Sequence, residues 1–312
     1  MQIEIIKNSK KFLGISAVFL IISLVVFFAK GLNYGIDFSG GNLFQLKFEK
    51  SITLNQINSN LDEIAKTIHQ VNPNSRKVQI SEDNTVIIRT PELKESQKTE
   101  VLNNLKKIGN FEINKEEKVG ASVGEELKAS AILGLSIGAV LIILYITFRF
   151  EFTFAVAAVA ALFHDLIIAI GVIALLGYEI DTPFIAAILT ILGYSINDTI
   201  VVFDRIRENM KRKNRGTFEQ CLDKSVNQVM IRSLNTSVTT LFAIIAILVF
   251  GGDSLKTFIM TLLIGILAGT YSSVFIATPL VYILDKNKKG PNKGFNSFKE
   301  ETKKENEEKI LV

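Results

Sequence analysis

The sequence predicts a polytopic α-helical membrane protein with six transmembrane helices and one extracytoplasmic α+β domain. The chain of 312 residues is 48% hydrophobic and contains 22 Phe, a composition that is too apolar for an ordinary soluble domain. Six runs of about 20 apolar residues are each long enough to cross a bilayer. About 100 residues separate the first two runs, which is enough for one small domain with its own core.

The six predicted spans follow from the length of the apolar runs. A basic start precedes the first run, so a cleaved signal peptide is one interpretation of it. Its apolar stretch of about 18 residues exceeds the usual length of about 7 to 15, and no small-x-small site precedes Lys30, so we expect an uncleaved anchor. The last run is long enough to tilt or bend. The runs are approximately Phe12–Ala29, Ala129–Phe148, Phe154–Gly177, Thr182–Phe203, Ser233–Gly251 and Leu255–Leu284.

The basic residues predict the orientation of these spans. Lys7, Lys10 and Lys11 precede the first span, seven Lys or Arg residues follow the fourth within residues 205–224, and the tail is rich in Lys. All of these fall on one side, which the positive-inside rule assigns to the cytoplasm. The connections at residues 178–181 and 252–254, on the other side, carry acids and no base.

We therefore expect both termini to be cytoplasmic. We also expect the polar tail to be disordered. The predicted parts are residues 1–30 (N-terminus and first helix), 31–128 (extracytoplasmic domain), 129–285 (five-helix transmembrane bundle) and 286–312 (cytoplasmic tail).

The extracytoplasmic segment alternates between strand and helix patterns. Strands are indicated by alternation of apolar and polar residues, and helices by apolar residues near helical spacing. The order is βαββαβ, which is that of a ferredoxin-like domain. The expected elements are a strand at Asn42–Phe48, a helix at Leu54–Val71, two strands at Lys77–Ile80 and Thr85–Arg89 around a turn at Glu82–Asn84, a helix at Lys94–Ile108 and a strand at Phe111–Glu116.

A glycine-rich motif, GIDFSGG, follows the first span. Its three glycines permit positive φ angles and close backbone approach, and an Asp side chain can cap a turn. The residues support two interpretations, a structural turn from the membrane into the domain and a binding loop. The residues concerned are Gly35, Asp37, Phe38, Gly40 and Gly41.

Two of the spans carry a polar face. Polar residues on the fourth span recur at helical spacing, and so do those on the fifth. Polar side chains within hydrocarbon face the interior of a bundle or a water-filled cavity, so we expect these two faces to meet. The residues are Thr190, Tyr194, Asn197 and Asp198 on the fourth span and Arg232, Asn235, Thr236, Thr239 and Thr240 on the fifth.

The most costly of these residues is Asp198, a carboxylate within an apolar run. If the fourth span ends near Asp204 and the fifth begins near Asn227, then Asp198 and Arg232 lie roughly 9 and 8 Å inside, at matching depth. Separation of such a pair could take up a proton. In the alternative interpretation Arg232 extends to the interface and Asp198 ends the span, with Thr199–Lys213 as a helix on the membrane surface.

The third span carries a second polar pair, His164 and Asp165, near its middle. The two side chains either satisfy each other in a purely structural way or take part in ion movement. The residues alone leave both interpretations open.

Several classes of function are disfavoured by the sequence. There is no nucleotide-binding motif, no arrangement of Ser or Cys that suggests hydrolysis, and only one cysteine, Cys221. We expect no enzyme activity, cofactor or metal. The net charge of +4 is small for this length, so nucleic-acid binding is also disfavoured.

Four motifs together resemble a known family, the SecF subunits of the bacterial Sec protein translocase, which form part of the SecD/SecF family in the resistance-nodulation-division superfamily. The resemblance covers nearly all of residues 1–285. One departure is Ala121, where the family has Pro, at the entrance to the second span. The motifs are GIDFSGG at 35–41, VGASVGEEL at 119–127, FRFEFTFAVAAVAALFHD at 148–165 and GYSINDTIVVFDRIREN at 193–209.

The resemblance implies a subunit of the cytoplasmic membrane that pairs with SecD about a pseudo-two-fold axis and associates with the SecYEG channel. It implies that proton movement helps to pull preproteins across the membrane, and YajC is a further candidate partner. The family's proton-pathway Asp and Arg fall on Asp198 and Arg232. With their polar neighbours, the candidates for a proton pathway are Asp198, Arg232, Asp165, His164, Asn197 and Thr236.

Two other functions stay open. One is half of a small-molecule efflux transporter, for which an external domain of about 100 residues is small. The other is a passive scaffold that stabilises the channel without ion coupling. The coupling ion, H⁺ or Na⁺, is not determined by these residues.

Overall fold

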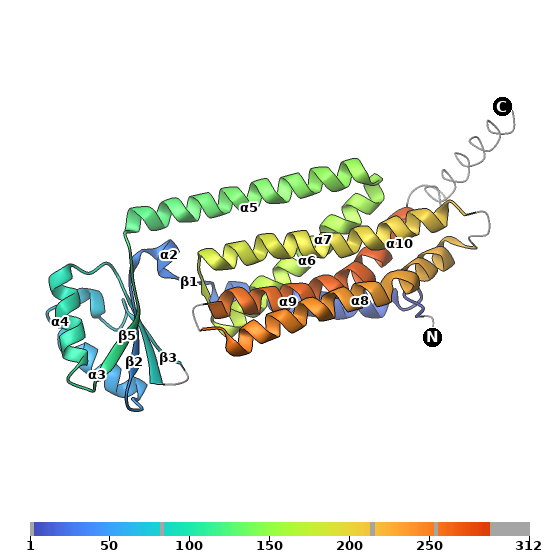
Figure 1. Ribbon diagram of the computed structural model, residues 1–312. Helices are drawn as coiled ribbons and strands as arrows, with labels where there is room; N and C mark the ends of the chain where they lie inside the picture. The colour runs from blue at the N-terminus through green and yellow to red at the C-terminus, as the bar shows by residue number, and fades with distance from the viewer. Residues whose placement is uncertain (1–2, 82–83, 213–215, 253–254, 288–312) are drawn as a thin grey trace, which may run out of the picture. The chain divides into compact units, whose positions relative to one another are not determined.

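The computed structural model describes residues 3–81, 84–212, 216–252 and 255–287 (Figure 1). Two compact units make up the chain. One, here called the membrane unit, is formed by Met1–Asn33 and Gly134–Val312, and the other, the sheet unit, by Tyr34–Leu133.

The membrane unit is a bundle of long helices. Within the described residues, six helices are long and apolar enough to cross a membrane, and they overlap the six predicted spans. In the bundle α9 packs against α6, α7 and α8, while α1 packs against α6 (Figure 1). The elements are α1 (Ser9–Lys30), β1 (Asn33–Tyr34), α5 (Ala121–Arg149, which enters this unit at Gly134), α6 (Phe152–Leu176), β6 (Glu179–Ile180), α7 (Thr182–Met210), α8 (Phe218–Phe250), α9 (Lys256–Ser272), a π-helical turn (Ser273–Ala277) and α10 (Thr278–Asn287).

Three helices extend well beyond the predicted apolar runs. α5 begins at Ala121, α7 continues to Met210, and α8 begins at Phe218 rather than at Ser233. A capping box fixes the start of α8, because the Thr217 hydroxyl accepts from the backbone of Gln220 and the Gln220 side chain accepts from the backbone of Thr217. Hydropathy could not find these extensions because they are amphipathic and not uniformly apolar.

The helix that carries Asp198 has no break. α7 runs from Thr182 to Met210 with Asp198 in its interior. The alternative in which Asp198 ends the span and a separate helix follows it along the membrane surface is therefore wrong.

The sixth span bends by a change of helix type. α9 ends at Ser272, and the π-helical turn Ser273–Ala277 joins it to α10. Pro279 follows two residues later and has no N–H to give to the preceding turn. A π-turn at this place absorbs the resulting mismatch in backbone hydrogen bonds.

The N-terminal segment before α1 is docked on the bundle, which the sequence did not predict. Ile5 and Ile6 are buried in the hydrophobic cluster of the membrane unit. Their backbone N–H groups both donate to the Asp223 carboxylate of α8 at 3.0 Å. Asn227, one turn further along α8, accepts from the Ile3 N–H and donates to the Ile3 carbonyl, each at 2.9 Å.

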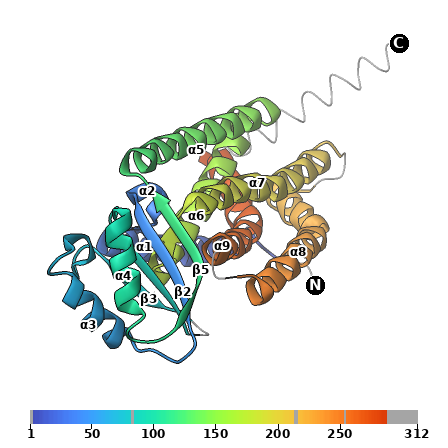
Figure 2. The same cartoon turned by 60° about the vertical axis from the view of Figure 1, so that its left-hand side comes forward.

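The sheet unit has the predicted order of strands and helices. Its four-stranded sheet runs β3-β4-β2-β5 with all three neighbouring pairs antiparallel, and Figure 2 shows α3 and α4 together on one face of it. The elements are α2 (Ile36–Ser39), β2 (Gly41–Phe48), α3 (Leu54–Ile64), a 3₁₀ turn (His69–Val71), β3 (Lys77–Ile80), β4 (Thr85–Thr90), α4 (Glu95–Leu105) and β5 (Phe111–Val119).

The core of the sheet unit lies between the sheet and these two helices. Phe44, Leu46 and Phe48 alternate along β2 and are buried with apolar residues of α3 and α4, as the period of a half-buried strand requires. Lys98 on α4 donates to Glu116 on β5 and to Glu95, and these hydrogen bonds raise the pKa of Lys98 to about 12. The Lys98 ammonium group therefore stays charged at neutral pH, and its contact with Glu116 links α4 to β5.

One predicted helix of the sheet unit is too long. The segment Leu54–Val71 was expected to be a single helix, but α3 ends at Ile64 and a 3₁₀ turn follows at His69–Val71. Thr67 and Ile68 are β-branched and disfavour a helix, and Ile68 adopts an extended conformation. Residues 82–83 of the predicted turn, residues 253–254 and the tail from 288 lie outside the described residues.

Candidate functional site

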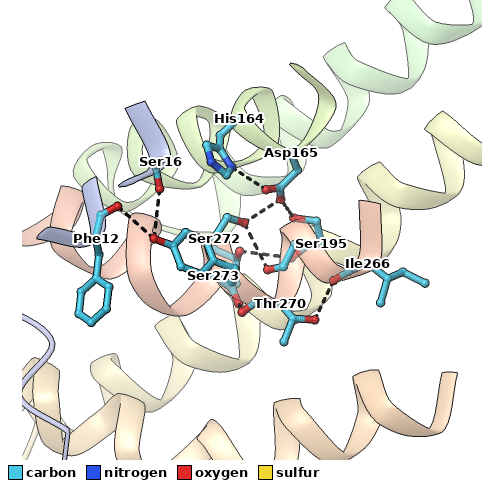
Figure 3. Close-up of polar contacts among 12 residues, drawn as sticks. Phe12, Ser16, His164, Asp165, Ser195, Ile266, Thr270, Ser272 and Ser273 are labelled. Atoms are coloured by element: carbon cyan, nitrogen blue, oxygen red, sulfur yellow. Dashed lines mark hydrogen bonds and ion pairs between the residues drawn. The ribbon is translucent and has the colours of Figure 1, made fainter. Parts of the chain in front are cut away.

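The polar centre of the membrane unit is Asp165 on α6, which is 0% exposed. One carboxylate oxygen, Oδ2, accepts from the hydroxyl of Ser195 on α7 at 2.6 Å and from that of Ser272 on α9 at 2.7 Å. The other oxygen, Oδ1, lies 2.9 Å from Nδ1 of His164. Figure 3 shows these four side chains converging from three helices.

The imidazole of His164 continues this cluster towards α1. Its ring stacks on Tyr271 of α9 with centroids 6.4 Å apart. The Tyr271 hydroxyl donates to the backbone carbonyl of Phe12 at 3.0 Å and lies 3.4 Å from the hydroxyl of Ser16 (Figure 3). Buried polar groups thus link α6, α7 and α9 with α1.

Asp198 lies on α7 three residues after Ser195, and its surroundings are different. The residue is 3% exposed, yet its Oδ2 atom has no hydrogen-bond partner among the described residues. An unpartnered carboxylate oxygen away from water is costly. Asp198 therefore has a carboxylate oxygen that is free to accept, whereas both oxygens of Asp165 have partners.

The register of α7 against α8 places the predicted partners of Asp198. Two cross-helix hydrogen bonds fix this antiparallel register: Asn209 Nδ2 to Ser225 Oγ at 2.9 Å, and Tyr194 Oη with Thr240 Oγ1 at 3.2 Å. Between these points Thr236 comes level with Asp198. Arg232 lies one helical turn, roughly 6 Å, nearer to the Asn209 end.

Arg232 consequently does not form a direct ion pair with Asp198. Within the described part of the chain, no nitrogen of Arg232 lies within 4.0 Å of an Asp198 oxygen. The guanidinium is nonetheless near enough to act electrostatically on the carboxylate. The prediction of matching depth is thus corrected to an offset of about one turn.

The expectation that the two polar faces meet is correct only at the Tyr194–Thr240 contact. α8 buries a different face, which includes Val226, Val229 and Ser233, because its apolar and small residues pack between α7 and α9. The remaining polar residues are exposed on the surface of this chain. They are Thr190 and Asn197 on α7 and Arg232, Asn235, Thr236 and Thr239 on α8, here called the polar stripe.

The glycine motif is a tightly packed turn within the sheet unit. Gly35 precedes α2, which contains Asp37 and the buried Phe38, and Gly40 and Gly41 adopt φ angles of 69° and 123°. A Cβ on Gly40 would lie 2.9 Å from the Ala121 Cα, and a Cβ on Gly41 would lie 2.2 Å from the Thr90 carbonyl oxygen. This geometry favours the structural interpretation of the motif, and the binding-loop interpretation stays a prediction.

The motifs that are far apart in the sequence pack in pairs. In the sheet unit, Gly40 of the glycine motif meets Ala121 and Gly124 of the VGASVGEEL motif. In the membrane unit, Arg149 forms an ion pair with Asp204 at 3.0 Å, and the rings of Phe150 and Phe154 contact Phe203 edge-on. Each pair therefore forms one structural joint.

Three features of the membrane unit escaped the sequence prediction: Ser195, Ser272 and the docked N-terminal segment. Serine is common in membrane helices, so Ser272 carried no signal that would single it out. Ser195 could have been found as the small polar residue three positions before Asp198.

Among the described residues no group of three His, Cys, Asp or Glu side chains could hold a metal ion.

Comparison with family models identifies two matches. The model described as protein export membrane protein SecD/SecF, C-terminal, matches residues 97–287, and that described as the SecD/SecF GG motif matches residues 25–52.

Curated relatives agree with these matches. The protein translocase subunit SecF of Sebaldella termitidis is 47% identical over the whole of both chains, and that of Calditerrivibrio nitroreducens is 38% identical over 92% of this chain and 96% of its own. The protein translocase subunit SecDF of Thermus thermophilus is 38% identical over 82% of this chain but only 35% of its own length.

The fold is also that of a solved relative. A crystal structure of SecDF from Thermus thermophilus, described as a translocon-associated membrane protein, superposes with a TM-score of 0.84 at 34% identity, and it covers 92% of this chain and 39% of the SecDF chain. The chain belongs to the SecF family of protein translocase subunits, which are integral, non-catalytic accessory membrane proteins of protein export.

Proposed function

We propose that this chain pairs with a SecD subunit and couples the proton motive force to the export of preproteins across the cytoplasmic membrane. The observation that carries this proposal is the unpartnered oxygen of the buried Asp198, with Thr236 at its level and Arg232 one turn away.

This arrangement suits a carboxyl group that alternates between a protonated and an ionised state. When neutral, Asp198 can remain in its apolar surroundings without a counter-charge, and when ionised it needs one. Arg232 can supply that charge if its long side chain moves by about one helical turn. Alternate opening of this pair to the two sides of the membrane would carry one proton in each cycle.

The polar stripe supports pairing with SecD. Its six residues lie within membrane-spanning helices and are exposed on this chain. Such groups are unfavourable against lipid, so the stripe needs either polar partner helices or a water-filled path. The SecDF relative supports SecD as the source of those helices, because its name combines SecD and SecF and this chain matches 35% of its length.

The remaining partners and the orientation are part of the same proposal. The pair associates with the SecYEG channel, with translocating preproteins and with YajC. Both termini face the cytoplasm, as the basic residues at one end of the helices support. The sheet unit is a ferredoxin-like extracytoplasmic domain, a type that its strand order and its two covering helices support.

Replacement of the charged pair tests this function. Asp198→Asn and Arg232→Ala should each abolish the gradient-dependent stimulation of export in inverted membrane vesicles, because neither variant can form the ionised pair. Membrane insertion and co-purification with SecD should not change.

The matched control is Asp204→Asn, which removes a carboxylate charge from the same helix while its amide oxygen can still accept from Arg149, so it should retain the stimulation. Full stimulation in both test variants would refute the proposal and favour a passive scaffold.

A further inference from the structure

Asp165 is the most completely satisfied charged group in the described part of the membrane unit. Its two oxygens receive three contacts, two from serine hydroxyls and one from an imidazole nitrogen. A hydroxyl donates a single proton, and an ionised carboxylate only accepts. Each oxygen of Asp165 therefore has at least one partner, unlike Oδ2 of Asp198, and within the described residues the unpartnered atom of this cluster is Nε2 of His164.

The contacts of Asp165 hold α7 and α9 at a place where glycines of α9 pack tightly against α7. A Cβ on Gly269 of α9 would lie 2.9 Å from the Ser195 Cβ, and a Cβ on Gly265 would lie 2.2 Å from Ile191 of α7. Small residues at such positions allow helices to pack closely in membranes. Rotation of α7 about its axis would break both the close packing and the Ser195 hydrogen bond.

Ser195 connects this contact to the proposed ion site. It precedes Asp198 by three residues, and the hydroxyl of Thr199 donates to the Ser195 carbonyl at 3.2 Å. Residues three apart lie on neighbouring parts of one helical face. The orientation of α7 about its axis, which the Ser195 hydrogen bond fixes, therefore also sets the direction in which Asp198 points.

We propose that Asp165 is a positioning residue: through Ser195 and Ser272 it locks α7 against α9, and this lock sets the orientation in which Asp198 works. The inference rests on the proposed function of Asp198, and it gives Asp165 a role other than that of a group on the proton pathway. Asp165 acts through its hydrogen-bond geometry and not through loss or gain of a proton.

Two substitutions separate these roles. In Asp165→Asn, the amide oxygen can accept from both serines while the amide nitrogen donates to Nδ1 of a neutral His164, so every contact survives. We expect gradient-dependent stimulation of export within about twofold of wild type. In Asp165→Ala, both hydroxyls lose their acceptor, and we expect a loss of roughly tenfold or more.

A thiol-labelling experiment reads the orientation of α7 directly. Asn197 is exposed on this chain and Thr199 is buried, so when the full chain is produced without SecD in a Cys221→Ala background, Asn197→Cys should react with the membrane-permeant N-ethylmaleimide much faster than Thr199→Cys. Asp165→Asn should preserve this contrast, and Asp165→Ala should reduce it. If Asp165→Ala does not accumulate in the membrane, Ser195→Ala combined with Ser272→Ala removes the same contacts and should give the same reduction.

The outcomes distinguish this inference from the function on which it rests. If Asp165→Asn is as inactive as Asp198→Asn, Asp165 itself carries charge or protons and the positioning role is wrong, while the proposed function stands. An unchanged labelling contrast after loss of the hydrogen bonds would also overturn the inference. If Asp198→Asn is fully active, the proposed function fails, and the labelling result still decides whether Asp165 locks α7.

Discussion

At the scale of single residues, two buried carboxylates of the same bundle differ in what surrounds them. Asp165 accepts from two serines and contacts an imidazole, whereas Asp198 keeps an oxygen without a partner. A carboxylate whose oxygens have hydrogen-bond partners stabilises one arrangement of its neighbours. A buried carboxylate that lacks a partner is stabilised by a proton or by movement of a counter-charge towards it. This contrast supports the two proposals, in which Asp165 fixes the helices and Asp198 responds to the ion.

Gly41 gives a prediction at this scale. Gly41→Ala would place a methyl group 2.2 Å from the Thr90 carbonyl at a φ of 123°, so we expect a loss of at least about 2 kcal/mol of stability. Thermal unfolding of the full chain in detergent measures this loss, with unfolding of the sheet unit monitored by its susceptibility to tryptic cleavage.

Gly109→Ala is the control for this variant, because a Cβ there meets only ordinary contacts at 3.7 Å. It should change stability by no more than about 0.5 kcal/mol. Equal stability of the two variants would show that the glycine turn is less constrained than its packing indicates.

At the scale of elements, the ends of the helices are held by contacts that hydropathy does not register. The N-terminal segment is held on α8 by Asp223 and Asn227, and the end of α5 is held on α7 by the Arg149–Asp204 ion pair. α8 therefore carries the docked segment at one end and the polar stripe further along. A movement of α8 would have to accommodate or release that segment.

The docked segment can be released by removing its acceptor. In a Cys221→Ala background, Ile5→Cys should react slowly with a maleimide because Ile5 is 0% exposed. Adding Asp223→Ala removes two hydrogen bonds worth about 1 kcal/mol each, so the labelling rate should rise by roughly tenfold or more. Asp223→Asn keeps an acceptor oxygen and should label nearly as slowly as the parent. Equal rates in all three proteins would contradict the docking.

At the scale of the whole molecule, the sequence predicts the elements better than their contacts. The six spans follow from apolar length, and the βαββαβ order of elements along the sheet unit follows from alternation, helical spacing and turns, because all of these are local patterns. The extension of α8 to Phe218 was missed because it is amphipathic. The break after Ile64 was missed because apolar spacing continues through β-branched residues that end the helix.

The candidate site was predictable to a similar extent. A charge within an apolar run marks Asp198 without any knowledge of its neighbours, since its cost is a property of the bilayer. Which helix each polar face meets depends on rotation and register, and the sequence contains no direct measure of either. This is why Ser195 and Ser272 were missed. It is also why the polar residues of α8 were expected to be buried against α7.

Sensitivity to a protonophore tests whether export is coupled to the proton gradient through Asp198. Preprotein translocation is measured in inverted vesicles with ATP held constant, with and without the protonophore, for wild type and Asp198→Asn. We expect the protonophore to slow the wild type to the rate of Asp198→Asn and to leave that variant unchanged. A protonophore effect of equal size in both would contradict it.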